Sequence, residues 1–73
     1  MSEEMIFCKN VKILRLKNNL TQMEMAHICG IGVKSLSSIE KGIIPPRLSV
    51  SILVSISNYF RISPYDMFDK VIK

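Results

Sequence analysis

Residues 20–42, LTQMEMAHICGIGVKSLSSIEKG, carry the signals for two short helices joined by a tight turn. Thr21 and Glu24 have the spacing of a capping box, in which the threonine hydroxyl accepts a hydrogen bond from the backbone N–H of Glu24 and the glutamate carboxylate accepts one from that of Thr21. The capping box predicts a helix that begins at Gln22. Gly30 can adopt the left-handed conformation that ends a helix, so we expect the chain to turn there.

A second helix is predicted directly after this turn, over residues 33–41. Gly32 can serve as its N-cap, and Leu36 and Ile39 share one face of the helix. Ala26 in the preceding helix is small enough for the two helices to cross closely. Two short helices joined by a glycine-containing turn form a helix-turn-helix, whose second helix typically enters the major groove of DNA. An ordinary helical hairpin of a small bundle is the alternative interpretation.

The remaining sequence predicts three more helices, with two consecutive prolines excluding a helix just before the fourth. They are expected over about residues 3–18, from a Ser49 cap to about Phe60, and from Pro64 after a Ser63 cap. In the first of them, Phe7, Val11 and Leu14 are expected to face the core. The methionines expected to fill gaps in the core are Met5, Met23, Met25 and Met67. The chain contains no repeat or internal linker, and we therefore expect residues 1–73 to form a single all-α domain.

The chain resembles the lambdoid phage repressor and Cro family, also called XRE-type regulators, over roughly residues 11–68. No single matching position is specific for this family, but the complete set in this order is. The matching positions are Leu14-Arg15, Leu20-Thr21-Gln22, Ala26, Gly30, Leu36, Ile39-Glu40 and Gly42, followed by a proline-containing loop and the Ser63-Pro64 helix start. This resemblance implies a compact five-helix, lambda-repressor-like DNA-binding domain that binds an operator as a dimer.

Geometry and the resemblance together assign the DNA contacts. Base reading is expected from the exposed face of the second helix of the motif, at Val33, Lys34, Ser35, Ser37 and Ser38. Phosphate binding is expected from Thr21, Gln22, Met23, Lys41 and Arg47. Lys34 is the only long donor on the reading face, so direct readout is expected to be sparse and DNA shape to be comparatively important. Arg15 and Glu40 match a buried ion pair of the family that joins the first and third helices.

Basic residues are concentrated in the middle of the chain. From Lys9 to Arg61 there are eight basic residues and two acidic ones, and the net charge of the whole chain is +4. The other acidic residues lie near the ends, at Glu3, Glu4, Asp66 and Asp69. This distribution fits a polyanionic partner such as double-stranded DNA. Solubility alone is the other explanation of a basic excess.

The sequence contains few residues that could support catalysis or bind a metal. Cys8 and Cys29 are separated by twenty residues, which is neither a metal-ligand nor a redox spacing. We expect Cys29 to be a small core residue and His27 to be solvated. Because no nucleophile is paired with a base, we expect no enzymatic activity, cofactor, metal or small-molecule ligand. The absence of a long apolar stretch and of a signal peptide predicts a cytoplasmic protein that does not enter a membrane.

The predicted fourth helix is apolar around most of its circumference. At 100° per residue, one side carries Val50, Leu53, Val54 and Phe60, and another carries Leu48, Ile52, Ile56 and Tyr59. Such a helix is either central to the bundle or covered on one flank by a second subunit. We favour a second subunit, because small domains expose few contiguous apolar patches. The homodimer interface is therefore expected at Ile52, Ile56 and Tyr59, with help from Tyr65 and Phe68 of the fifth helix.

These observations predict a sequence-specific, double-stranded DNA-binding transcriptional regulator, in concrete terms a repressor that binds a pseudopalindromic operator as a homodimer. Two other functions use the same fold. One is an antitoxin that binds both a toxin and its own operator, and the other is a helix-turn-helix domain recruited only for protein contacts.

Overall fold

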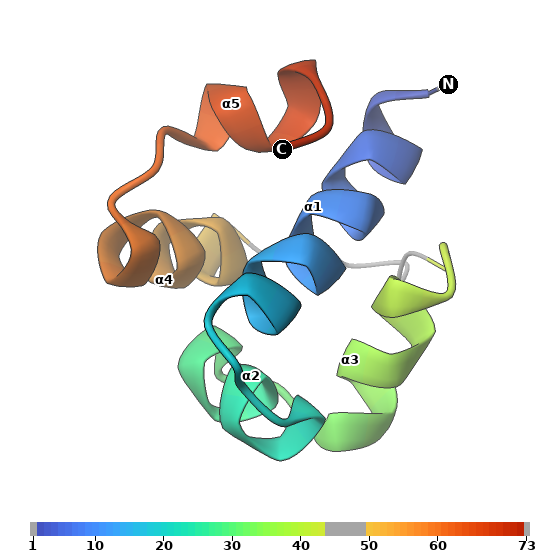
Figure 1. Cartoon of the computed structure of the whole chain (residues 1–73), viewed down its shortest axis with the longest axis vertical. Helices are drawn as coiled ribbons and strands as arrows, with labels where there is room; N and C mark the ends of the chain where they lie inside the picture. The colour runs from blue at the N-terminus through green and yellow to red at the C-terminus, as the bar shows by residue number, and fades with distance from the viewer. Residues whose placement is uncertain (1, 44–49, 73) are drawn as a thin grey trace.

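The computed structural model describes residues 2–43 and 50–72, which contain five helices and no strand. The helices are α1 (Glu3–Lys17), α2 (Gln22–Cys29), α3 (Val33–Glu40), α4 (Val50–Phe60) and α5 (Pro64–Asp69). In Figure 1, α1 runs through the middle of the molecule, with α2 and α3 around one of its ends and α5 near the other. The prediction of a five-helix, all-α fold with a helix-turn-helix is confirmed.

The two helices of the motif begin and turn as their local signals predict. The Thr21 hydroxyl accepts from the Glu24 amide at 3.1 Å, and the Glu24 carboxylate accepts from the Thr21 amide at 2.8 Å. These hydrogen bonds favour the charged carboxylate, and they lower the pKa of Glu24 below its usual value. Gly30 ends α2 with a φ of 73°, in the left-handed region. The capping box and this glycine thus set the limits of α2.

Two helix ends differ slightly from the prediction. α1 ends at Lys17, with Asn18 as its C-cap and Asn19 at a φ of 55°, which asparagine tolerates better than most residues. α3 ends at Glu40, one residue early, because Lys41 is its C-cap and the left-handed Gly42 turns the chain away. The predicted Ser49 cap lies outside the described residues.

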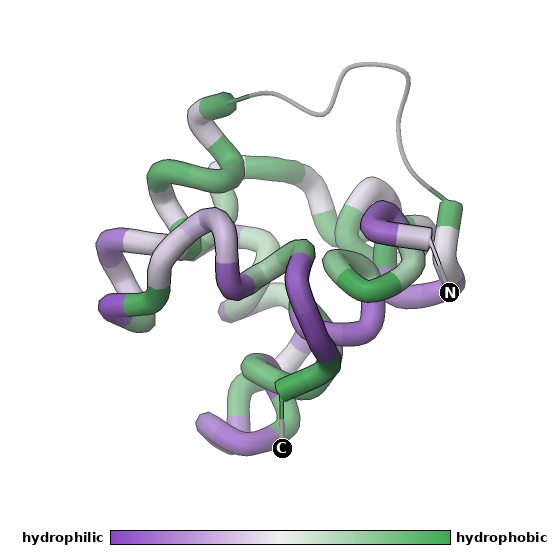
Figure 2. Tube along the Cα trace, turned by 90° about the horizontal axis from the view of Figure 1, so that it is seen from above, coloured by the Kyte–Doolittle hydropathy of each residue, from purple (hydrophilic) through white to green (hydrophobic). Residues whose placement is uncertain are grey.

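All five helices contribute to one apolar core. Its buried side chains are Phe7, Cys8, Val11, Leu14, Met25, Ala26, Cys29, Leu36, Ile39, Ile52, Ile56 and Met67. The tube in Figure 2 shows hydrophobic and hydrophilic residues interspersed along the described trace, as is typical of amphipathic helices. The placement of Met25 and Met67 in the core is confirmed. That of Met5 and Met23 is wrong, since these side chains are 39% and 72% exposed.

The structure also corrects the placement of α4. Ile52 and Ile56, expected in a dimer interface, are 5% and 0% exposed and belong to the core of the chain itself. The reason is that α4 packs against both α2 and α5, so this flank has neighbours within the same chain. The exposed apolar side chains of α4 are instead Val50, Val54 and Tyr59.

A buried asparagine ties the end of the chain to α1. Asn10 has no exposed surface, and its Nδ2 donates to the carbonyls of Met67 at 2.9 Å and Lys70 at 3.1 Å. Its Oδ1 accepts from the amide of Ile72 at 2.8 Å. Both amide hydrogens and the oxygen are therefore satisfied, as burial of a polar group requires. Asn10 thereby closes the C-terminal end of α5 against α1.

The corrected position of α4 predicts how its residues respond to truncation. Ile56→Ala should lower the free energy of unfolding by about 2–5 kcal/mol, because it opens a cavity in a filled core. Val54→Ala on the exposed side of the same helix is the matched control and should change it by at most about 0.5 kcal/mol. Chemical denaturation measures both. Equal, small effects of the two substitutions would contradict the burial of Ile56 in the core.

Candidate nucleic-acid interface

One face of α3 is turned away from the core. Leu36 and Ile39 are buried, and the helical period places Lys34, Ser37, Ser38 and Lys41 on the opposite side. Lys34 and Lys41 are almost in line along the helix axis and about 10 Å apart by helix rise. The outer face of α3 thus carries two hydroxyls between two lysines, a combination of hydrogen-bonding groups and positive charge that suits a DNA groove.

The predicted base-reading residues are all accessible to some degree. Val33, Lys34 and Ser35 in the first turn of α3 are exposed, whereas Ser37 and Ser38 are half-buried. Gly32 precedes them as an N-cap without a side-chain hydrogen bond, and a Cβ added to it would meet no atom within 4 Å. The first turn of α3 is therefore its most accessible part, and base contacts by these five residues stay a prediction.

The N-terminus of α2 offers backbone donors next to α3. The capping box satisfies the amides of Thr21 and Glu24, but helix geometry leaves those of Gln22 and Met23 without an acceptor in their own helix. Thr21 is exposed, Gln22 is half-buried and Met23 is 72% exposed. Two unpaired N–H groups at the positive end of a helix are suited to bind a phosphate oxygen.

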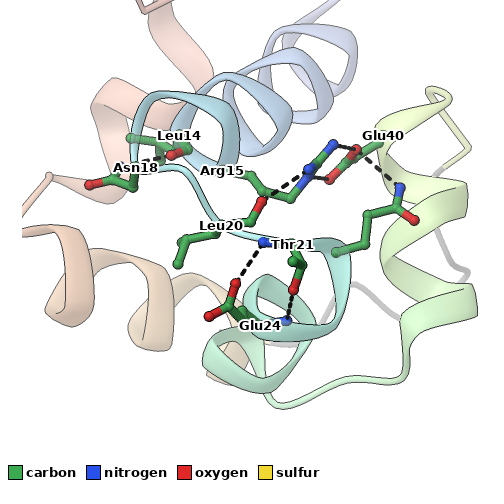
Figure 3. Close-up of polar contacts among 8 residues, drawn as sticks. Leu14, Arg15, Asn18, Leu20, Thr21, Glu24 and Glu40 are labelled. Atoms are coloured by element: carbon green, nitrogen blue, oxygen red, sulfur yellow. Dashed lines mark hydrogen bonds and ion pairs between the residues drawn. The ribbon is translucent and has the colours of Figure 1, made fainter.

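Arg15 and Glu40 form the ion pair that the resemblance implies. Arg15 donates from Nε to Glu40 Oε2 at 2.7 Å and from Nη2 to Glu40 Oε1 at 3.0 Å. The two side chains are only 13% and 5% exposed, and the hydrogen bonds to Glu40 raise the pKa of Arg15. Arg15 Nη1 also donates to the carbonyl of Leu20 at 3.1 Å. Figure 3 shows this guanidinium between the Leu20 carbonyl and the Glu40 carboxylate.

The turn after α3 is shaped by its glycine. Gly42 has a φ of 89°, and a Cβ added there would lie 3.2 Å from the Met5 side chain, so a larger residue would be strained. Its amide donates to the Ile39 carbonyl, and the amide of Ile43 donates to the Ser38 carbonyl, both at 2.9 Å. Lys41 is exposed beside this turn, as a phosphate contact requires. The predicted phosphate contact Arg47 lies outside the described residues.

Cysteine and histidine are residue types that can support catalysis or bind a metal, so the surroundings of Cys29 and His27 bear on function. Cys29 is buried as predicted, and burial, with a smaller contribution from the charge of Glu40, raises its pKa to about 11. The thiol is therefore protonated at neutral pH. His27 is exposed, and no cluster of three metal-binding side chains occurs among the residues that the structure describes. None of the helices within these ranges has the length and apolar character needed to cross a membrane.

One buried polar side chain, Asn10, was not predicted from the sequence. Asn10 could have been found, because it lies on the same helical face as Phe7 and Leu14, where a polar group must have a buried partner. The resemblance also implies that Gln22 braces the second helix of the motif, and its Nε2 donates to Glu40 Oε1, in α3, at 3.3 Å. Gln22 and Glu40 lie on different helices, and no sequence spacing indicates that they meet.

Comparison with known proteins agrees with this geometry. A family described as helix-turn-helix matches residues 11–67, which is most of the chain. The matched region contains α2, α3, α4 and the part of α1 that carries Arg15. No curated protein and no solved structure matches the chain.

The ion pair makes a distinctive prediction for stability. Replacing either Arg15 or Glu40 with Met should destabilise the fold by about 3–5 kcal/mol, because the other charge is left buried and unpaired. Replacing both should cost much less than the sum of the two single changes. Thermal or urea unfolding of the three variants provides the measurement. If the single changes have small, additive effects, the pair is a solvated surface contact.

Proposed function

Because the chain belongs to the helix-turn-helix family of XRE-type, Cro- and repressor-like DNA-binding transcriptional regulators, we propose that it is a repressor that binds a pseudopalindromic operator as a homodimer. We further propose that the protein acts in the cytoplasm. The observation that carries this proposal is that the N-terminus of α2 and the outer face of α3, both suited to bind DNA, lie next to each other. The unpaired amides of α2 lie at a helix end that contacts α3, whose outer face is basic and polar.

In the proposed complex, the two surfaces have different tasks. α3 lies in the major groove, where Lys34 donates to guanine O6 and N7 and Val33 contacts a thymine methyl group. Gln22 and the first amides of α2 bind a phosphate, and Thr21 holds that helix end in place. Phosphate contacts fix the register and orientation of the protein on DNA, whereas base contacts select the sequence.

The short side chains of α3 also argue for a dimer. Lys34 is accompanied on the reading face mainly by serines, which give one helix little power to select a site. Two copies that read half-sites about one helical turn apart would multiply that selectivity. With Ile52 and Ile56 assigned to the core, we place the interface on the exposed apolar side chains of α4 and α5. Tyr59 and Tyr65 are 59% and 70% exposed, while Phe68 is half-buried and stacks on Phe7.

The proposed DNA contacts predict that binding is salt-sensitive. They also predict that base-reading and phosphate-binding residues respond differently to substitution. The affinity for a duplex should fall as salt rises, with a log–log slope of roughly 0.9 per neutralised phosphate. Lys34→Ala should cost about 1–3 kcal/mol on the preferred duplex and relax the preference at one base step, whereas Gln22→Ala should weaken binding to all duplexes alike. Lys70→Ala removes the same charge from the exposed residue after α5 and is the control.

Fluorescence anisotropy with labelled duplexes at several salt concentrations measures these effects. A Lys34→Ala protein with unchanged sequence preference would refute the proposed reading role. No binding to selected or random duplexes at low salt would refute the regulatory function itself.

The dimer is tested by sedimentation of the purified protein with and without an operator duplex. We expect a dimer at high micromolar concentration, and Tyr59→Ser or Tyr65→Ser to shift it toward folded monomers that bind the operator more weakly. A monomeric parent protein, both free and on DNA, would contradict the homodimer.

A further inference from the structure

We propose that Glu40 positions the Gln22 side chain for its contact with a DNA phosphate, in addition to pairing with Arg15. This inference rests on the proposed function, because it concerns the phosphate contact of α2. It assigns Glu40 a part in DNA binding although it carries the same sign of charge as DNA.

The Glu40 carboxylate is a fixed acceptor. Both of its oxygens accept from Arg15, at 2.7 and 3.0 Å, and the side chain is 5% exposed, so it has little freedom to turn away. Oε1 accepts a further hydrogen bond from Gln22 Nε2 at 3.3 Å. The last residue of α3 is therefore in contact with the first residue of α2, at the helix end that offers its amides to a phosphate.

This contact decides which way the Gln22 amide faces. A carboxylate can only accept hydrogen bonds, whereas a glutamine side chain ends in an oxygen that accepts and an NH2 group that donates. The NH2 group must therefore face Glu40, and the Gln22 oxygen must point elsewhere. One N–H is used by Glu40, and the second is left to donate to a phosphate oxygen.

A fixed amide is an advantage for binding. A free glutamine side chain loses rotamer freedom when it is immobilised in a complex, and this loss weakens the affinity. In this protein, the orientation is already set by a residue that is itself held by Arg15. The ion pair thus connects the fold of the protein to the geometry of its phosphate contact.

The alternative is that Glu40 competes with DNA for the Gln22 amide. Under competition, or under simple repulsion between Glu40 and a phosphate, weakening the Glu40 contact would strengthen DNA binding. Under positioning, it would weaken binding. The sign of the effect therefore distinguishes these accounts.

The test is a double-mutant cycle of Glu40→Asp and Gln22→Ala, measured on a mixed-sequence duplex at low salt. Asp keeps the charge for Arg15 but withdraws the carboxylate by one methylene group, away from Gln22. We expect each single variant to bind about three- to tenfold more weakly, the usual effect of one hydrogen bond, and the double variant to bind no more weakly than either single one. Ile56→Ala, destabilised far from this contact, is the control and should bind normally where it is folded.

A second readout separates positioning from a general loss of stability. In the NMR spectrum of the 15N-labelled parent protein, the Gln22 side-chain amide proton that is hydrogen-bonded to Glu40 should be shifted from its position in an exposed glutamine and should exchange more slowly with water. In folded Glu40→Asp this proton should resemble that of an exposed glutamine. Stronger DNA binding by Glu40→Asp, additive losses in the cycle, or an unchanged Gln22 amide signal would overturn the proposal. If the parent protein binds no duplex, the proposed function fails instead.

Discussion

The buried ion pair between Arg15 and Glu40 determines how α1 and α3 meet. Each charge has lost most of its contact with water, so separating the two would leave a buried charge without a partner. The hydrophobic effect that buries the apolar side chains of both helices is non-directional. The bidentate geometry of a guanidinium and a carboxylate adds directional specificity to this contact. The position of the outer face of α3 therefore depends on a polar contact on its inner side as well as on its buried apolar residues.

The same ion pair organises the start of α2. Arg15 holds the Leu20 carbonyl just before the capping box, and Glu40 holds the side chain of Gln22 just after it. α2 and α3 have eight residues each, a length at which isolated helices are not stable in water. They depend on the core below them and on these contacts at their ends. The surface proposed to bind DNA is consequently built from two short helices that are rigid only in the context of α1.

The sequence predicted the features of this fold that have local causes. The capping box at Thr21 and the left-handed turn at Gly30 each depend on a few neighbouring residues, and both were placed correctly. The family resemblance supplied the pairing of Arg15 with Glu40, which lies beyond the reach of local signals.

Features that depend on tertiary packing were predicted less well. α4 is apolar on more than one side, so its periodicity could not show that the flank with Ile56 faces α2 and α5 rather than a partner. The contact of Gln22 with Glu40 depends on how α2 and α3 are set by α1, which no spacing reveals. Arg47 lies outside the described residues, and its phosphate contact stays a proposal.

The central claim is that α3 and the N-terminus of α2 form one DNA-binding surface. Backbone amide NMR of the 15N-labelled protein during titration with a duplex tests this claim most directly. The account predicts that the largest shifts occur at Gln22, Met23, Lys34 and Lys41, while the amide of Ile72, held by Asn10 at the other end of the molecule, changes little. Shifts concentrated in α4 and α5, with α3 unchanged, would contradict it.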